Sequence, residues 1–217
     1  MKKYVAFFDL DHTIFDVNSG RIIIEHAYKQ GLIDTKKIFL AYFFSALYGI
    51  GLLKAEYIMI KLADWLKGIA EKEFAAFTDE VFEKHLRNTV RSQAKKEVEQ
   101  HRENGAQLVI LSAATPYICE SVKKLLNFND VLCSKMEVID GIFSGYPDGP
   151  YCYGEEKLNQ VNEYCAKSGF SLQDAYYYAD SHSDIVVLEA IGNPICVTPD
   201  NTLKRQAEKR GWPIYNW

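Results

Sequence analysis

Alternating helical and strand patterns in the second half of the chain constrain the fold more than any other feature. The polar stretch 88–105 has helical spacing and ends at Gly105, and the apolar run 107–113, QLVILSA, follows it as a strand. Further helices are expected over 114–126, 155–169, 183–192 and 201–211, and further strands over 175–181 and 194–200. This alternation is typical of a parallel sheet with helices on both faces. We therefore predict an α/β fold class with a doubly wound, mostly parallel, Rossmann-like sheet.

A long helical stretch separates the first strand from this alternating region. Residues 4–10, YVAFFDL, form a short β-branched and aromatic run that predicts a buried strand. Residues 17–88 have helical spacing and no convincing strand pattern. We expect an α/β catalytic core of residues 1–16 and 89–217, with a helical-bundle cap of residues 17–88 inserted after the first strand. A hairpin turn is expected at Asp140-Gly141.

Charge and cysteine usage limit the partners and the compartment. The formal net charge of −4 argues against a nucleic-acid partner, which a basic face would attract. Five widely spaced cysteines without a C-x-x-C pair favour reduced thiols over a disulfide frame or a zinc site. The first residues lack the features of an export signal. We expect a cytoplasmic protein without a transmembrane segment, and the oligomeric state stays open.

Residues 38–53, IFLAYFFSALYGIGLL, carry no charge and are flanked by lysines. Sixteen residues fall short of the roughly 20 that a membrane-spanning helix needs. Two interpretations are open for this segment. We favour packing inside the helical cap over contact with a lipid-linked substrate, because buried helices commonly have such a composition.

Polar side chains follow three of the predicted strands at their carboxyl ends. Asp9 and Asp11 follow the first strand, Ser112 ends the second, and Asp180 follows a later one. Ligands of doubly wound sheets bind beyond these strand ends, so the side chains are expected to converge. An isolated D-x-D is more often a helix cap or a solvated turn. Here the polar side chains that follow other strands, Ser112 and Asp180, favour a ligand-binding site instead.

The acids suit Mg²⁺, which takes hard oxygen ligands and often only one or two carboxylates. Asp9, Asp11, Asp180 and Asp184 are the candidate metal-site residues. A cation that neutralises the carboxylates lets Asp9 attack phosphorus and form an aspartyl-phosphate. Asp11 is placed to protonate the leaving oxygen and then to activate water. Asp184 is expected to bind metal-bound water or to orient a lysine, and a first-turn acid that stabilises a helix is the alternative.

Phosphate needs its own ligands. The Ser112 hydroxyl and the backbone at Ala113, just before a helix, form a candidate phosphate site. Lys157, near the start of a helix, is the candidate cation beside Mg²⁺. By position alone, Ser112 could be a loop residue and Lys157 a solvated surface charge. His12 and His182 flank the acids and are assigned no role.

Together these residues resemble the four motifs of the haloacid dehalogenase-like hydrolase superfamily. The motifs are D-L-D-H-T after a strand, Ser112, an isolated Lys157, and A-D-S-H-S-D after another strand, and they span Asp9 to about Pro199. The helical insertion resembles the phosphoserine-phosphatase-like branch. Residues 18–33 and 192–214 are similar to bacterial subfamily IB hydrolases within it.

The resemblance implies a Mg²⁺-dependent phosphomonoesterase that works through phosphoaspartate, on a small phosphorylated metabolite or a phospholipid head group. It implies Asp9 as the nucleophile, Asp11 as acid/base with its main-chain carbonyl as a metal ligand, and Ser112 as a phosphate ligand. It also implies Lys157 as the charge stabiliser, with Asp180 and Asp184 as metal-site acids.

One departure bears on the substrate. Phosphoserine phosphatases carry a glutamate beyond the first motif that binds the substrate amine, where this chain has Asn18 and Ser19, so phosphoserine is disfavoured. The fourth motif has Ala179 and Ser183 where glycine and asparagine are frequent. A phosphotransferase or mutase is the nearest alternative activity. A receiver-like signalling module is a less favoured alternative, because such a module does not need a lid like the helical insertion.

Overall fold

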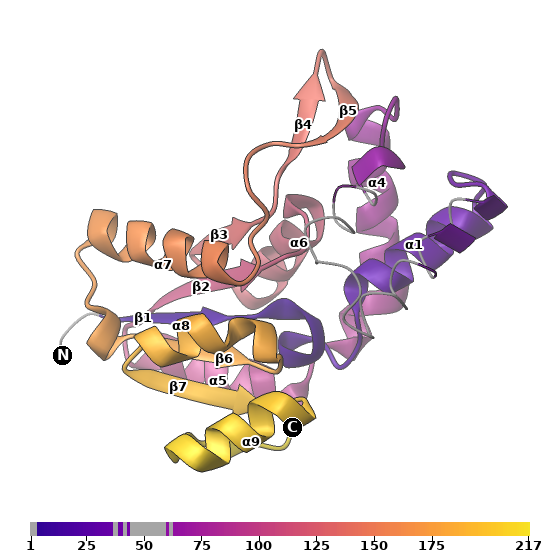
Figure 1. The fold of residues 1–217 in the computed structure, drawn as a ribbon. Coiled ribbons are helices and arrows are strands. Elements are labelled where there is room, and N and C mark those ends of the chain that lie inside the picture. Colours follow the sequence, from indigo (N-terminus) through magenta and orange to yellow (C-terminus); the bar gives the residue numbers. More distant parts are fainter. Residues whose placement is uncertain (1–3, 37–38, 41–42, 44–59, 61–62) are drawn as a thin grey trace.

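A parallel β-sheet forms the centre of the protein (Figure 1), seen in a computed structural model that describes residues 4–36, 39–40, 43, 60 and 63–217. Its six strands run in the order β3-β2-β1-β6-β7-β8, and each neighbouring pair is parallel. The predicted doubly wound α/β fold is confirmed. The strands are β1 (Val5–Phe8), β2 (Gln107–Ser112), β3 (Asp130–Cys133), β6 (Tyr176–Ala179), β7 (Asn193–Val197) and β8 (Ile214–Tyr215).

Helices cover both faces of the sheet, so the central strands are apolar along their whole length. All four residues of β1 are fully buried. Phe8 and Ile110 lie in the core cluster that includes α5 and α6, whereas Phe7 and Val109 face the cluster that includes α7, α8 and α9. These helices are α5 (Ser92–Glu103), α6 (Pro116–Leu126), α7 (Glu155–Ser168), α8 (Ile185–Ala190) and α9 (Asn201–Arg210).

The two ends of the predicted cap lie side by side. Phe15 and Val90 form an antiparallel bridge, and the Asp16 amide donates to the Thr89 carbonyl at 3.0 Å. Arg91 donates to the main-chain carbonyls of His12, Phe15 and Trp217. An insertion can leave and rejoin the core at this point, and the division at residues 17–88 stays a prediction. The described helices of the insertion are α1 (Ser19–Lys29) and α4 (Glu71–Val81), which continues into a π-helical turn, Phe82–Leu86.

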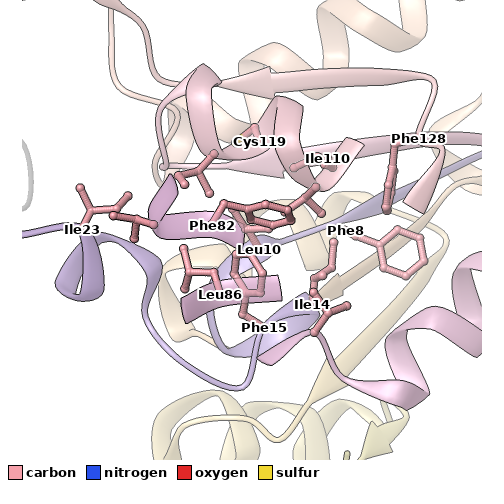
Figure 2. Packing of buried hydrophobic residues seen from close by; sticks show 14 of the residues in the cluster. Phe8, Leu10, Ile14, Phe15, Ile23, Phe82, Leu86, Ile110, Cys119 and Phe128 are labelled. Carbon is pink, nitrogen blue, oxygen red and sulfur yellow. The ribbon is translucent and has the colours of Figure 1, made fainter. Parts of the chain in front are cut away.

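The insertion shares its hydrophobic core with the sheet. Figure 2 shows Ile23, Phe82 and Leu86 from the insertion in one cluster with Phe8 and Ile110 from the strands. A separate hairpin, β4 (Met136–Ile139) and β5 (Ile142–Pro147), turns at Asp140-Gly141 as predicted. Its main chain bonds to the insertion, with the Gly68 amide donating to the Phe143 carbonyl at 2.9 Å. The insertion is therefore anchored to the core by packed side chains and by backbone hydrogen bonds.

Several elements differ from the sequence-based expectation. The helix expected over 88–105 begins only at Ser92, because Arg87–Thr89 is a 3₁₀ turn and Val90 is extended. The last strand, β8, was not predicted, since two residues at a sheet edge leave no periodic signal. Most of the apolar segment 38–53 lies outside the described residues, so neither interpretation of it is tested. Among the described residues, no helix is long and apolar enough to cross a membrane.

A buried histidine on α5 predicts how stability depends on pH. His101 lies between the hydroxyls of Tyr4 at 2.8 Å and Tyr178 at 2.9 Å, and burial lowers its pKa to about 4. Tyr178 donates to Glu97, so the Nε2 of neutral His101 donates to Tyr178 and Nδ1 accepts from Tyr4. An unfolded histidine has a pKa of about 6.5. The contribution of His101 to stability is thus complete above pH 6.5 and is lost as the pH falls toward 4.

We expect this loss to reach about 2 kcal/mol of the free energy of unfolding, after allowance for partial solvent screening. Denaturant unfolding of the wild type and of His101→Gln between pH 7 and pH 4.5 measures it. The other titratable groups are the same in both proteins, so the difference between their pH dependences of stability isolates the contribution of His101. Equal pH slopes in the two proteins would contradict the assignment of a neutral histidine.

Candidate active site

Asp9 and Asp180 lie at the carboxyl ends of adjacent strands. β1 and β6 pair with Phe8 opposite Tyr178, and the Asp9 amide donates to the Tyr178 carbonyl at 2.9 Å. Thr13 in the loop after β1 donates its hydroxyl to Asp180 Oδ1 at 3.5 Å. The first and fourth motifs are therefore brought to one edge of the sheet, as their positions after two strands predicted.

Ser112 lies at the same edge on the other side of β1. β2 pairs with β1 so that Ile110 is opposite Phe8, and Ser112 is buried at the end of the strand. The Ser112 hydroxyl accepts a hydrogen bond from the Ala114 amide at 3.2 Å. This bond closes a tight turn through Ala113 just before α6 begins. The candidate phosphate site thus has a buried hydroxyl and the amino end of an 11-residue helix.

Lys157 is buried and points at the acids rather than into solvent. Its ammonium group lies 2.8 Å from Asp9 Oδ1 and 2.6 Å from Asp184 Oδ1. Gly154 precedes α7 with φ 54° and ψ −126°, a conformation suited to glycine, and so turns the first helical turn toward the strand ends. The predicted surface alternative for Lys157 is wrong, because only 3% of the residue is exposed.

The charges at this edge shift several pKa values. Burial raises the pKa of Asp9 to about 7, against the attraction of Lys157. Burial, then the neighbouring charges of Asp9 and Asp184, raise the pKa of Asp180 to about 8. Burial alone would lower the pKa of Lys157, but Asp184 and Asp9 raise it well above its ordinary value. Burial and the neighbouring carboxylates therefore outweigh the attraction of the single lysine at both Asp9 and Asp180.

Asp11 is held by the beginning of the insertion. The Ser19 amide, at the start of α1, donates to Asp11 Oδ1 at 2.9 Å. Burial raises the pKa of Asp11, and the hydrogen bond from the Ser19 amide opposes the rise. Asn18 caps α1 by accepting from the Arg21 amide at 2.8 Å. The helix therefore begins at Ser19, directly after its cap.

The two histidines beside the acids have structural contacts. His12 adopts a left-handed backbone, with φ 56°, in the sharp turn after β1. His182 donates its amide to Asp200 Oδ2 at 2.7 Å, and its ring contacts the same oxygen at 3.0 Å. Asp200 in turn caps α9 and donates its amide to the Asp180 carbonyl. These contacts hold the loop that carries Asp180.

The donor set fits a divalent cation of the magnesium type. In the described part of the chain, no three or more Asp, Glu, His or Cys side chains are grouped closely enough to enclose a metal. Mg²⁺ does not need such a group, because it commonly takes one or two carboxylates, carbonyl oxygens and waters. Asp9 and Asp180 offer two carboxylates with raised pKa values. A cation bound beside them would lower these pKa values and favour the charged carboxylates. Lys157 contacts one oxygen, Oδ1, of Asp9 and one oxygen, Oδ1, of Asp184.

Sequence reasoning missed Tyr177 as a residue of this site. Its hydroxyl donates to Asp184 Oδ1 at 2.8 Å and accepts from Lys157 at 3.1 Å. Tyr177 lies in the YYYAD run, where three tyrosines in a row conceal the alternation of faces. Because side chains alternate along a strand, Tyr177 lies on the face of the sheet that carries Phe7 and packs against α7, the helix that bears Lys157.

This fold and this arrangement of residues define a class of hydrolases, and comparison with known proteins agrees. The family model of the haloacid dehalogenase-like hydrolases matches residues 6–189. The chain belongs to this family. The predicted family and hydrolase class are confirmed.

Two relatives that match nearly the whole chain are phosphatases by name. A histidinol-phosphatase of Neisseria meningitidis is 26% identical, over 99% of both chains. A probable phosphatase of Mycobacterium tuberculosis is 28% identical over 98% of this chain and 75% of its own length. A substrate-bound phosphoserine phosphatase shares the fold with a TM-score of 0.75 at 18% identity, covering 99% of this chain and 93% of that one. The fold is thus that of the phosphoserine-phosphatase-like branch.

Proposed function

We propose that the protein is a Mg²⁺-dependent phosphomonoesterase that works through a phosphorylated Asp9. The observation that carries this proposal is the buried contact of Lys157 with both Asp9 and Asp184 at the strand edge that also holds Ser112 and Asp180. A buried cation beside a carboxylate provides a positively charged binding site for a phosphoryl group next to a nucleophile. The family and the phosphatase relatives support this proposal.

Each residue then has a distinct task. Asp9 Oδ attacks phosphorus, and the bond from phosphorus to the leaving oxygen breaks. Ser112, the backbone at Ala113 and Lys157 bind the phosphoryl oxygens, which places phosphorus between Asp9 and the leaving oxygen. Asp9, Asp180 and the Asp11 carbonyl would hold Mg²⁺, which would neutralise the carboxylates and let a phosphate dianion approach them. Asp184 orients Lys157.

Asp11 is the proton donor and acceptor in this proposal. Burial favours its protonated form, which suits an acid that must give a proton to the leaving alcohol. It then takes a proton from the water that hydrolyses the phosphoaspartate. The Ser19 amide fixes one carboxyl oxygen, so the acid is aimed from the border between the core and the insertion.

The proposed substrate class is a small phosphorylated metabolite or a phospholipid head group. Asn18 uses its side-chain oxygen to cap α1, and neither Asn18 nor Ser19 supplies a carboxylate for a substrate ammonium. Phosphoserine is therefore disfavoured, although relatives with phosphoserine phosphatase and histidinol-phosphatase names exist.

Metal removal tests the proposal. Protein dialysed against a chelator is expected to lose at least about 100-fold in phosphatase kcat and to regain it with Mg²⁺, because charge neutralisation is worth several kcal/mol in the transition state. The assay uses a panel of amino-acid, histidinol, sugar and lysolipid phosphates with phosphate release as the readout. Circular dichroism controls for folding. Undiminished turnover after chelation would contradict the proposed metal dependence.

A further inference from the structure

The Tyr177 hydroxyl lies inside the ion pair that the proposed mechanism uses. Tyr177 is fully buried on β6, and its hydroxyl contacts Lys157 at 3.1 Å and Asp184 at 2.8 Å. The Lys157 ammonium also lies 5.8 Å from the centre of the Tyr177 ring. The tyrosine therefore touches both ends of the pair.

The hydrogen bonds around Lys157 can be counted. A lysine ammonium has three N–H donors, and three acceptors surround it: Asp9 Oδ1, Asp184 Oδ1 and the Tyr177 oxygen. Tyr177 gives its own hydrogen to Asp184 Oδ1, so its oxygen is left to accept from Lys157. Burial and the nearby Asp184 charge keep the pKa of Tyr177 well above its ordinary value, so it stays a donor.

We propose that Tyr177 is a positioning residue that fixes the Lys157 ammonium and the Asp184 carboxylate for phosphoryl transfer. This inference rests on the proposed function of Lys157. The lysine side chain has four rotatable bonds, and two carboxylates alone do not hold it in one position. The tyrosine supplies the third contact from a rigid strand, which defines where the ammonium lies relative to Asp9.

Loss of this contact is expected to affect kcat more than KM. Substrate binding needs a positive charge in the pocket, which a displaced Lys157 still provides. The transition state needs that charge aligned with the phosphoryl oxygens while the bonds change, and this alignment is what the hydroxyl secures. Removing an interaction that is made only in the transition state lowers kcat and kcat/KM together.

Tyr177→Phe and Tyr178→Phe form a matched pair for the test. Each removes one buried hydroxyl from β6, but Tyr178 lies on the opposite face and bonds to Glu97 and His101. We expect Tyr177→Phe to lower kcat about 10-fold with KM changed less than about 2-fold, and Tyr178→Phe to leave both unchanged. Equal kcat in Tyr177→Phe and the wild type, with both folded, would overturn the proposal and leave Tyr177 a structural role.

A measurement without substrate separates this inference from the proposed function. NMR of ¹⁵N-labelled protein detects lysine ammonium groups, and the loss of one signal in Lys157→Arg identifies Lys157. In Tyr177→Phe, exchange of these hydrogens with water is expected to accelerate at least about 5-fold, and in Tyr178→Phe to stay as in the wild type. Unchanged exchange in Tyr177→Phe would overturn the positioning role. Faster exchange without phosphatase activity in the wild type would instead count against the proposed function.

Discussion

Replacing Asp9 by asparagine is expected to lower kcat for phosphomonoester hydrolysis by at least about 10⁴-fold, because an amide does not attack phosphorus and no aspartyl-phosphate can form. The fold is expected to survive. Lys157 keeps its buried ion pair with Asp184 when Asp9 becomes neutral. Burial raises the pKa of Asp9 to about 7 against the attraction of Lys157, so a neutral side chain of the same shape is tolerated at this position. The amide oxygen of the substituted side chain can still accept from Lys157.

Two measurements check this prediction. Steady-state phosphate release gives kcat, and rapid quenching with labelled substrate detects a phosphorylated protein in the wild type but not in the variant. Asp16→Asn makes the same chemical change on an exposed residue of the same loop and is expected to keep full activity. More than about a tenth of wild-type kcat in Asp9→Asn would remove Asp9 as the nucleophile.

The core of the fold could be predicted from the sequence because burial on both faces leaves a strong signal. Apolar runs such as 107–113 can only be central strands or buried helices, and their length and spacing between helices selects strands. The order of the strands in the sheet, with β1 between β2 and β6, was not predictable in this way. It depends on which helices cross over which face, and no local pattern encodes that.

The site was predictable in its residue types and less so in its contacts. Asp9, Ser112 and Asp180 follow strands, and the carboxyl ends of parallel strands must meet at one edge. Lys157 was a weaker prediction, since only the turn at Gly154 directs α7 and its first turn toward that edge. The hydrogen bond from the Ser19 amide to Asp11 has no sequence signal, because any residue other than proline has an amide N–H.

Replacing Lys157 by methionine is expected to affect both the fold and the reaction. The change leaves Asp9 and Asp184 buried without their cation, and breaking a buried ion pair in this way costs about 3 kcal/mol of the free energy of unfolding. kcat is expected to fall at least about 10³-fold, because the charge that faces the phosphoryl oxygens is lost. Denaturant unfolding and steady-state kinetics measure the two effects.

The control lies on the same helix. Lys167→Met removes an exposed lysine that pairs with Glu163 on the surface, and it is expected to leave both stability and kcat close to those of the wild type, because exposed ion pairs contribute little. A second change separates folding from catalysis. Lys157→Met with Asp184→Asn removes one of the two carboxylates left without a cation, so stability is expected to recover in part while kcat stays low. If kcat recovered together with stability, Lys157 would serve only the fold, because a charge needed by the transition state cannot be replaced by removing its partner.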